Sequence, residues 1–202
     1  MAGKVRLLAL LGSPRKAGNT EVLMHAALRG AEEAGASVQS FWLRALAVSP
    51  CIECRRCDAT GACVLKDRMN DIYAALEDAD RLILSSPVFF YGVSGWTKAV
   101  LDRFQPFWAR KRLLKRPAGE GRERYGAFIS AAATGGRRLF EGSILTVRYC
   151  FEEAGFYYAG HILVRGVDNT GDMARHPEHL AAAEEMGRAL VLEPSSVRKY
   201  EG

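Results

Sequence analysis

The stretch Gly12–Thr20 constrains the fold more than any other feature, because an apolar run precedes it and a helical pattern follows it. The run from Val5 to Leu11 is nearly continuous, which is typical of a strand covered on both faces. A helix that begins near Asn19 presents unpaired backbone N–H groups and the positive end of its dipole to the loop. A strand, a polar loop and a helix N-terminus in this order predict an anion cradle.

The side chains of this loop support the same prediction. Ser13, Asn19 and Thr20 add hydrogen-bond donors, and Arg15 adds a positive charge. Gly18 permits a close approach of the backbone to a ligand. An ordinary strand-to-helix turn, with Asn19 as the helix cap, is the alternative interpretation of the same residues.

Strand patterns and helix patterns alternate five times along the chain. The expected strands are Val5–Leu11, Ser37–Leu43, Arg81–Ser85, Tyr125–Ala132 and Phe156–Val164. The expected helices begin near Asn19, Arg68, Ser94, Arg138 and Pro177. Right-handed crossovers then predict an α/β fold, a doubly wound five-stranded parallel sheet in the order 2-1-3-4-5 with helices on both faces.

The length of 202 residues suits one domain of this kind. We expect a single domain over residues 1–195, a cysteine-rich insertion over 49–67 and a polar tail over 196–202. The hydrophobic fraction of 49% and the charged fraction of 25% are those of a globular protein. The basic run from Arg110 to Arg124 is expected to be a solvated, flexible loop rather than a steering surface.

The charge and hydropathy patterns narrow the class of partner. The formal charge of +5 favours anionic ligands, but no interleaved basic and aromatic pattern indicates nucleic acid. No apolar run approaches the ~20 residues that would span a bilayer. The N-terminal residues lack a signal-peptide pattern, so we expect a cytoplasmic protein that binds no membrane.

Two further loops follow expected strands and converge on the first loop at the carboxyl edge of the sheet. One loop contains Pro87, Val88, Phe89, Phe90, Tyr91 and Gly92, and the other contains Thr134, Gly135 and Gly136. Aromatic surface beside free amides suits a flat heteroaromatic ring, and a ring with one phosphate suggests FMN. Core packing or a dimer surface is the alternative role for the three aromatic residues.

These motifs carry a family resemblance. Gly12–Thr20, Ser86–Gly92 and Lys98–Arg103 together resemble the NADPH-dependent FMN reductase family of flavodoxin-like proteins, over about residues 4 to 190. The resemblance implies FMN held without a covalent link and reduced by NAD(P)H. It also implies a homodimer or homotetramer in which a partner subunit helps to wall the flavin site.

The resemblance also assigns roles to individual residues. It implies that Ser13, Arg15, Asn19 and Thr20 hold the phosphate, and that Pro87–Gly92 meets the isoalloxazine ring while Thr134–Gly136 meets its far side. Members of the family often have Tyr where this chain has Phe89, which removes a possible hydroxyl contact and keeps the stacking surface.

Four cysteines lie close together within the expected insertion. Cys51, Cys54, Cys57 and Cys63 have the spacing C-x2-C-x2-C-x5-C, and the first three match a spacing used for cubane clusters. Arg55 and Arg56 are expected to lower the pKa of these thiols. A zinc site and an unmetallated loop of thiols remain alternatives. Within the family the motif resembles the iron–sulfur flavoprotein branch, which implies a [4Fe–4S] cluster close to FMN.

Three functions are consistent with these features. The first is an FMN-dependent oxidoreductase that passes electrons between NAD(P)H or a low-potential carrier, FMN and a [4Fe–4S] cluster. The second is a cluster-free NAD(P)H-dependent FMN or quinone reductase, and the third is a non-enzymatic redox carrier or sensor. Each would have a small-molecule or protein electron donor or acceptor. His176 and His179 are expected to cap the last helix or to contact solvent.

Overall fold

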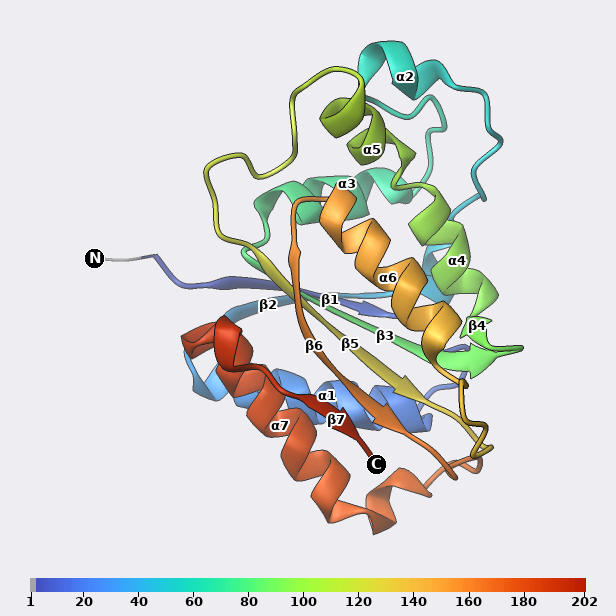
Figure 1. Cartoon of the computed structure of the whole chain (residues 1–202), viewed down its shortest axis with the longest axis vertical. Helices are drawn as coiled ribbons and strands as arrows, with labels where there is room; N and C mark the ends of the chain where they lie inside the picture. The colour runs from blue at the N-terminus through green and yellow to red at the C-terminus, as the bar shows by residue number, and fades with distance from the viewer. Residues whose placement is uncertain (1–2) are drawn as a thin grey trace.

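The computed structural model describes residues 3–202, and a largely parallel sheet crosses its centre between two layers of helices (Figure 1). The strands are β1 (Arg6–Leu11), β2 (Ser37–Trp42), β3 (Arg81–Phe89), β4 (Gly92–Val93), β5 (Tyr125–Ala131), β6 (Tyr157–Val164) and β7 (Lys199–Glu201). The helices are α1 (Asn19–Glu33), α2 (Arg56–Thr60), α3 (Met69–Asp78), α4 (Gly95–Asp102), α5 (Gln105–Arg112), α6 (Glu141–Glu153) and α7 (Pro177–Leu192).

The order of the five expected strands is confirmed, but their number was wrong. The sheet runs β2-β1-β3-β5-β6-β7, and all its pairings along this path are parallel. Two short strands were not expected: β4 pairs antiparallel with the end of β3, and β7 extends the edge beside β6. The segment 196–202, expected as a polar tail, therefore contributes a strand to the sheet.

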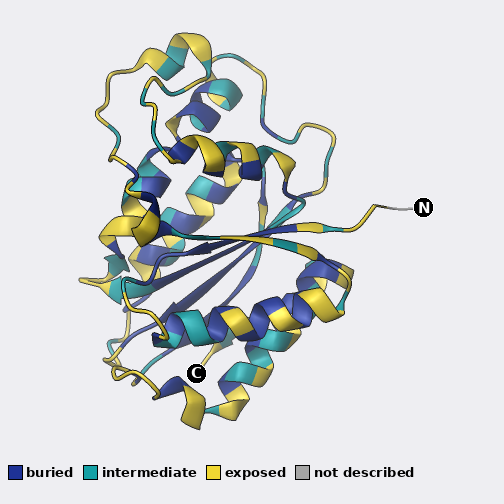
Figure 2. Cartoon of the chain, turned by 180° about the vertical axis from the view of Figure 1, so that it is seen from behind, coloured by how far each residue is buried: buried dark blue, intermediate teal, exposed yellow. Residues whose placement is uncertain are grey.

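The central strands are buried on both faces, as the apolar run of β1 predicted. Leu8 and Leu10 of β1 pack into a core that α3, α4, α5 and α6 cover. Leu7 and Ala9 pack into the opposite core beneath α1 and α7. Figure 2 shows the same arrangement from behind, with buried residues along the strands and on the inner sides of the helices.

The basic run from Arg110 to Arg124 differs from the expected flexible loop. Its first residues belong to α5, and Arg124 is fully buried. The Arg124 guanidinium donates to the carbonyl oxygens of Ala79 and Ala154 at 2.9 and 3.0 Å, and it lies 3.8 Å from the Phe156 ring centre. Burial lowers the pKa of Arg124 to about 10, so the side chain stays charged at neutral pH inside the core.

Among the described residues, no helix is both long enough and apolar enough to cross a membrane.

Candidate functional site

The loop between β1 and α1 meets the ends of β3 and β5 around a small cavity of about 110 Å³. The residues of this cavity that the sequence predicted as cofactor ligands are Ser13, Arg15, Gly18, Asn19, Thr20, Pro87, Val88 and Phe89. The cavity is smaller than the 300–1,000 Å³ typical of sites that enclose a whole ligand. It therefore suits one end of a cofactor whose remainder lies over the open edge of the sheet.

Close packing fixes the start of this loop. Gly12 donates its N–H to the carbonyl of Ser85 at 2.8 Å, and its own carbonyl accepts a hydrogen bond from the Ser94 hydroxyl at 2.6 Å. A Cβ at Gly12 would lie 1.9 Å from Oγ1 of Thr97, so no larger residue fits there. The first turn of α4 thus anchors the loop that enters α1.

The start of α1 offers the expected hydrogen-bond donors. Within residues 3–202, the backbone N–H groups of Gly18, Asn19 and Thr20 donate to no protein acceptor. The neighbouring N–H of Ala17 is occupied, because it donates to the Glu21 carboxylate at 2.8 Å. Three free amides at a helix N-terminus form a site that favours an anion.

Two predicted ligand side chains instead hold a neighbouring segment. Arg15 donates to the carbonyl oxygen of Asp168 at 2.9 Å, and Oδ1 of Asn19 accepts the Met173 N–H at 3.1 Å. Both partners lie more than 150 residues away in sequence, so the local sequence pattern could not predict these contacts. These contacts tie the loop after β6 to the start of α1.

Sequence reasoning missed a cationic group beside the same loop. The Trp42 ring NH donates to the carbonyl of Ser13 at 2.8 Å, and Arg44 donates to the carbonyl of Pro14 at 2.6 Å. The Lys16 ammonium and the Arg44 guanidinium lie 5.3 and 5.7 Å from the Trp42 ring centre. These cations add positive charge to a loop whose amides already favour an anion.

The aromatic segment after Phe89 forms a hairpin outside the cavity. Phe90 and Tyr91 have φ angles of 51° and 64°, and Phe90 is fully exposed. Hairpin turns with two such angles usually take Asn or Gly, because other side chains are strained there. The predicted residues Phe90, Tyr91 and Gly92 therefore do not line the cavity with Pro87, Val88 and Phe89.

The third loop lies beside this hairpin. Thr134 and Gly135 are exposed, Gly136 is half-buried, and all three lie outside the cavity lining. A Cβ at Gly136 would lie 3.1 Å from the Tyr91 hydroxyl, so the two loops are neighbours at the same edge of the sheet. The predicted convergence of the three loops thus leaves an open surface next to the cavity.

The four cysteines line one pocket of about 580 Å³ between the insertion and α5. Among the described residues, no three of their sulfurs lie within 4.8 Å of one another. A zinc ion held by thiolates at 2.3 Å would bring its sulfurs to about 3.8 Å apart. A pocket of this volume has room for a group larger than a single metal ion.

The expected effect of Arg55 and Arg56 on the thiols is wrong for Cys57. Burial raises the pKa of Cys57, and the neighbouring Asp58 carboxylate raises it further. The Arg55 side chain instead extends toward Glu53, at 3.8 Å. The Cys57 thiol therefore needs a positive group, such as a bound metal, to favour its thiolate form.

A buried ion pair closes the base of the cysteine segment. Arg103 donates to the carbonyl of Ser49 and to the Asp67 carboxylate, both at 2.9 Å, and the Ser49 N–H donates to Asp67 at 3.0 Å. Burial raises the pKa of Asp67, but the hydrogen bonds from Arg103, Ser49 and Met69 outweigh it and lower the pKa overall. The two ends of the segment are therefore held together at one point.

The same arginine supplies an unused donor at the pocket. The Arg103 side chain is 1% exposed, it lines the cysteine pocket, and its Nε–H has no partner among the described residues. The hydroxyl of Tyr73 donates to the Arg103 carbonyl at 2.6 Å. Buried donors without partners are rare, so this N–H fits an acceptor that a bound group would bring into the pocket.

One helix joins the two candidate sites. Its cap, Ser94, bonds to Gly12 of the loop between β1 and α1, and Arg103 follows its last residue at the cysteine pocket. A helix of 8 residues spans about 12 Å. Within one chain the two candidate sites therefore lie at opposite ends of α4.

Comparisons with known proteins place the chain in a family. The family described as NADPH-dependent FMN reductase matches residues 5–149. An iron-sulfur flavoprotein of Archaeoglobus fulgidus is 33% identical over 115 residues, which are 57% of this chain and 52% of that protein. An iron-sulfur flavoprotein of Methanocaldococcus jannaschii is 36% identical over 102 residues, 50% of this chain and 53% of that protein. The chain thus spans about half the length of these relatives.

Solved structures support the fold. An NAD(P)H:quinone oxidoreductase from Methanothermobacter marburgensis superposes with a TM-score of 0.71 at 16% identity. The match covers 93% of this chain and 96% of that chain. At this identity the likeness concerns the architecture of the sheet and its helices.

Proposed function

Because this chain belongs to the NADPH-dependent FMN reductase family, we propose that it is an FMN-dependent oxidoreductase of the iron–sulfur flavoprotein type. It would pass electrons between NAD(P)H or a low-potential carrier, FMN and a [4Fe–4S] cluster. The observation that carries the proposal is the pocket lined by all four cysteines, at the far end of the helix that anchors the phosphate loop. FMN and the cluster supply the redox chemistry when bound, and the chain supplies binding and orientation.

The free amides at the start of α1 are the proposed ligands of the FMN phosphate. Gly18, Asn19 and Thr20 offer these N–H groups, and Arg15 and Lys16 add positive charge. Pro87, Val88 and Phe89 would contact the ring, with Thr134–Gly136 at its far side. The Arg15 side chain would have to leave Asp168 to reach the phosphate, and at 63% exposure it is free to do so.

The cysteine pocket is proposed to hold the cluster through Cys51, Cys54, Cys57 and Cys63. The unpartnered Nε–H of Arg103 would donate to a sulfur of this group. Its buried positive charge would stabilise the added negative charge of the reduced state.

The exposed aromatic hairpin is proposed as a contact with a second copy of the chain. Phe89, Phe90 and Tyr91 are 48%, 104% and 56% exposed. A second copy that covered them would also cover the open surface beside the phosphate cavity, which supports a homodimer or homotetramer.

Anaerobic purification with an absorption spectrum and iron and sulfide analysis tests the proposal. We expect a flavin spectrum together with iron and acid-labile sulfide. A Cys63→Ser variant should lose most of the iron and keep the flavin. Cys150→Ser is the matched control, because Cys150 lies outside the segment and its pKa is raised to about 12 by burial.

The other results discriminate between the alternatives. Flavin without iron or sulfide in a strictly anaerobic sample would support the cluster-free FMN or quinone reductase. Bound flavin that neither NADH nor NADPH reduces would support a redox carrier or sensor. A colourless protein that takes up no added FMN would contradict all three functions.

A further inference from the structure

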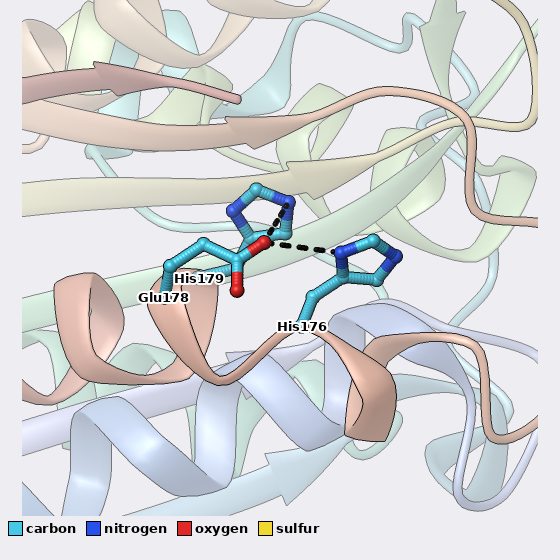
Figure 3. Close-up of side chains that lie close together, drawn as sticks. All are labelled: His176, Glu178 and His179. Carbon is cyan, nitrogen blue, oxygen red and sulfur yellow. Dashed lines mark hydrogen bonds and ion pairs between the residues drawn. The ribbon is translucent and has the colours of Figure 1, made fainter.

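Two histidines and a glutamate meet at the start of α7, far along the chain from the cysteines. His176 precedes the helix, and Glu178 and His179 lie in its first turn (Figure 3). The ligand atoms of these three side chains all lie within 4.8 Å of one another, and no other three His, Cys, Asp or Glu side chains among the described residues lie so close. Neither the flavin cavity nor the cysteine pocket includes them.

The ligand atoms have the separations of a first coordination shell. Oε1 of Glu178 lies 3.1 Å from Nδ1 of His176 and 3.8 Å from Nε2 of His179. Nitrogen and oxygen ligands at 2.0–2.2 Å around a tetrahedral zinc ion lie about 3.3 Å apart. Small side-chain rotations would therefore admit an ion between the three atoms.

The backbone and β7 hold the two imidazoles in place. Pro177 disfavours helical backbone angles at the residue before it, and His176 has φ −121° and ψ 70°. The Tyr200 hydroxyl lies 2.7 Å from Nδ1 of His179, and when this nitrogen donates to it, Nε2 presents its lone pair to Glu178. A metal-binding histidine usually makes such a bond through its other nitrogen.

Burial and charge agree with this use. The His179 side chain is buried at 8% exposure, so the body of the protein covers one side of the site. The Asp172 carboxylate lies 2.6 Å from the Arg175 guanidinium and offsets its positive charge. The positive end of the α7 dipole still opposes a bound cation. Glu178 supplies the compensating negative charge and is exposed, which leaves an open side for water or a further ligand.

We propose that His176, Glu178 and His179 form a second metal site, which binds one divalent ion of the zinc class through two imidazoles and one carboxylate. The site has open coordination positions and Tyr200 as the support of His179. It is independent of the proposed flavin and cluster chemistry, because none of its residues belongs to those sites.

Zinc titration of the whole protein, made without a polyhistidine tag and with its cysteine sites filled anaerobically, tests the site. We expect one equivalent of Zn²⁺ to bind with a Kd below about 10 µM by calorimetry. His179→Gln should weaken this equivalent about 100-fold. His25→Gln is the matched control, because His25 lies exposed on α1 beside Glu21 and should bind as the wild type does.

Two further readouts separate this site from the thiols and from misfolding. Co²⁺ in place of Zn²⁺ should give weak visible bands without the strong near-ultraviolet absorption of thiolate ligands. Zn²⁺ should raise the melting temperature of the wild type above its own metal-free value and leave that of His179→Gln at its own metal-free value. Equal zinc binding by the wild type and His179→Gln, or a wild-type Kd above about 1 mM, would overturn the proposal.

Discussion

At the scale of single residues, the buried ion pair of Arg103 is expected to contribute to stability. Its guanidinium is buried and binds Asp67, so Arg103→Gln would leave a carboxylate without its charged partner. We expect a loss of about 3 kcal/mol in the free energy of unfolding. Urea denaturation would measure this loss, and faster alkylation of Cys63 would report opening of the segment.

The control for Arg103 is another arginine with an acidic partner. Arg68 pairs with Asp71 while both side chains are exposed, 63% and 48%. Arg68→Gln should change the free energy of unfolding by less than about 0.5 kcal/mol. Equal losses in both variants would mean that the buried pair does not hold the cysteine segment.

Phe90 is a residue whose backbone and side chain favour opposite outcomes. Its φ of 51° is strained for an aromatic residue, and its side chain covers nothing within the chain. Phe90→Gly should raise the free energy of unfolding by about 0.5–1 kcal/mol while it weakens self-association. Thermal melting and sedimentation would measure the two effects. Unchanged self-association would exclude the hairpin from the interface.

At the scale of elements, the contact of α1 with α7 depends on two glycines. A Cβ at Gly187 would lie 1.8 Å from the Ala27 carbonyl, and one at Gly30 would lie 1.9 Å from the Glu184 carbonyl. Gly187→Ala should therefore force the helices apart and cost about 3 kcal/mol of stability by thermal melting.

The matched variant for this contact is Gly95→Ala in the first turn of α4. No atom lies within 4 Å of a Cβ there, and the backbone angle is ordinary. Alanine should stabilise this helix by about 0.5–1 kcal/mol. Similar destabilisation by both changes would contradict the steric explanation.

The long elements could be predicted from the sequence, and the short ones could not. The nearly continuous apolar run before Gly12 and the small residues on one side of α1 are long enough to predict a strand followed by a helix. β7 has three residues and depends on its pairing with β6, while α5 has a cationic last turn that resembles a loop. Arg124 illustrates the same difficulty, since no local pattern marks an arginine that the core will bury.

At the scale of the whole molecule, Asp80 links Arg6 of β1 to Arg122, which lies between α5 and β5. Burial raises its pKa, but hydrogen bonds from the Arg6 N–H and the Arg122 side chain outweigh it and lower the pKa to about 2. An unfolded Asp titrates near 3.9, so the folded state binds protons less tightly than the unfolded state. The resulting stability is complete above about pH 5 and is lost as the pH falls toward 2.

Asp80→Asn should measure that contribution. With partners that are partly exposed, we expect a loss of about 1–2 kcal/mol at pH 7. The difference from the wild type in urea denaturation should become small by about pH 2, where the folded carboxyl is half protonated. A difference that stays constant from pH 7 to pH 2 would show that charge is not its source.

The candidate site was predictable in its parts and not in its contacts. The residues Ser13 to Thr20 and the four cysteines could be named from spacing alone, and their roles as ligands stay predictions. The sequence could not show that Asn19 binds Met173, or that Trp42 lies beside Ser13, because those contacts depend on how distant loops meet. The two histidines at the start of α7 could be noted from the sequence, but their approach to Glu178 depends on the helix and on Tyr200.

The two ends of the cysteine segment lie next to each other, so the segment can be removed as a unit. Ser49 and Asp67 are one hydrogen bond apart, so a two-glycine linker in place of residues 50–66 should close the chain without shifting the sheet. We expect such a deletion to keep its circular dichroism and its affinity for FMN while it loses iron; loss of FMN binding would contradict this. A fold built in this way can gain, lose or exchange the segment over evolutionary time while the rest of the sheet and its helices stay the same.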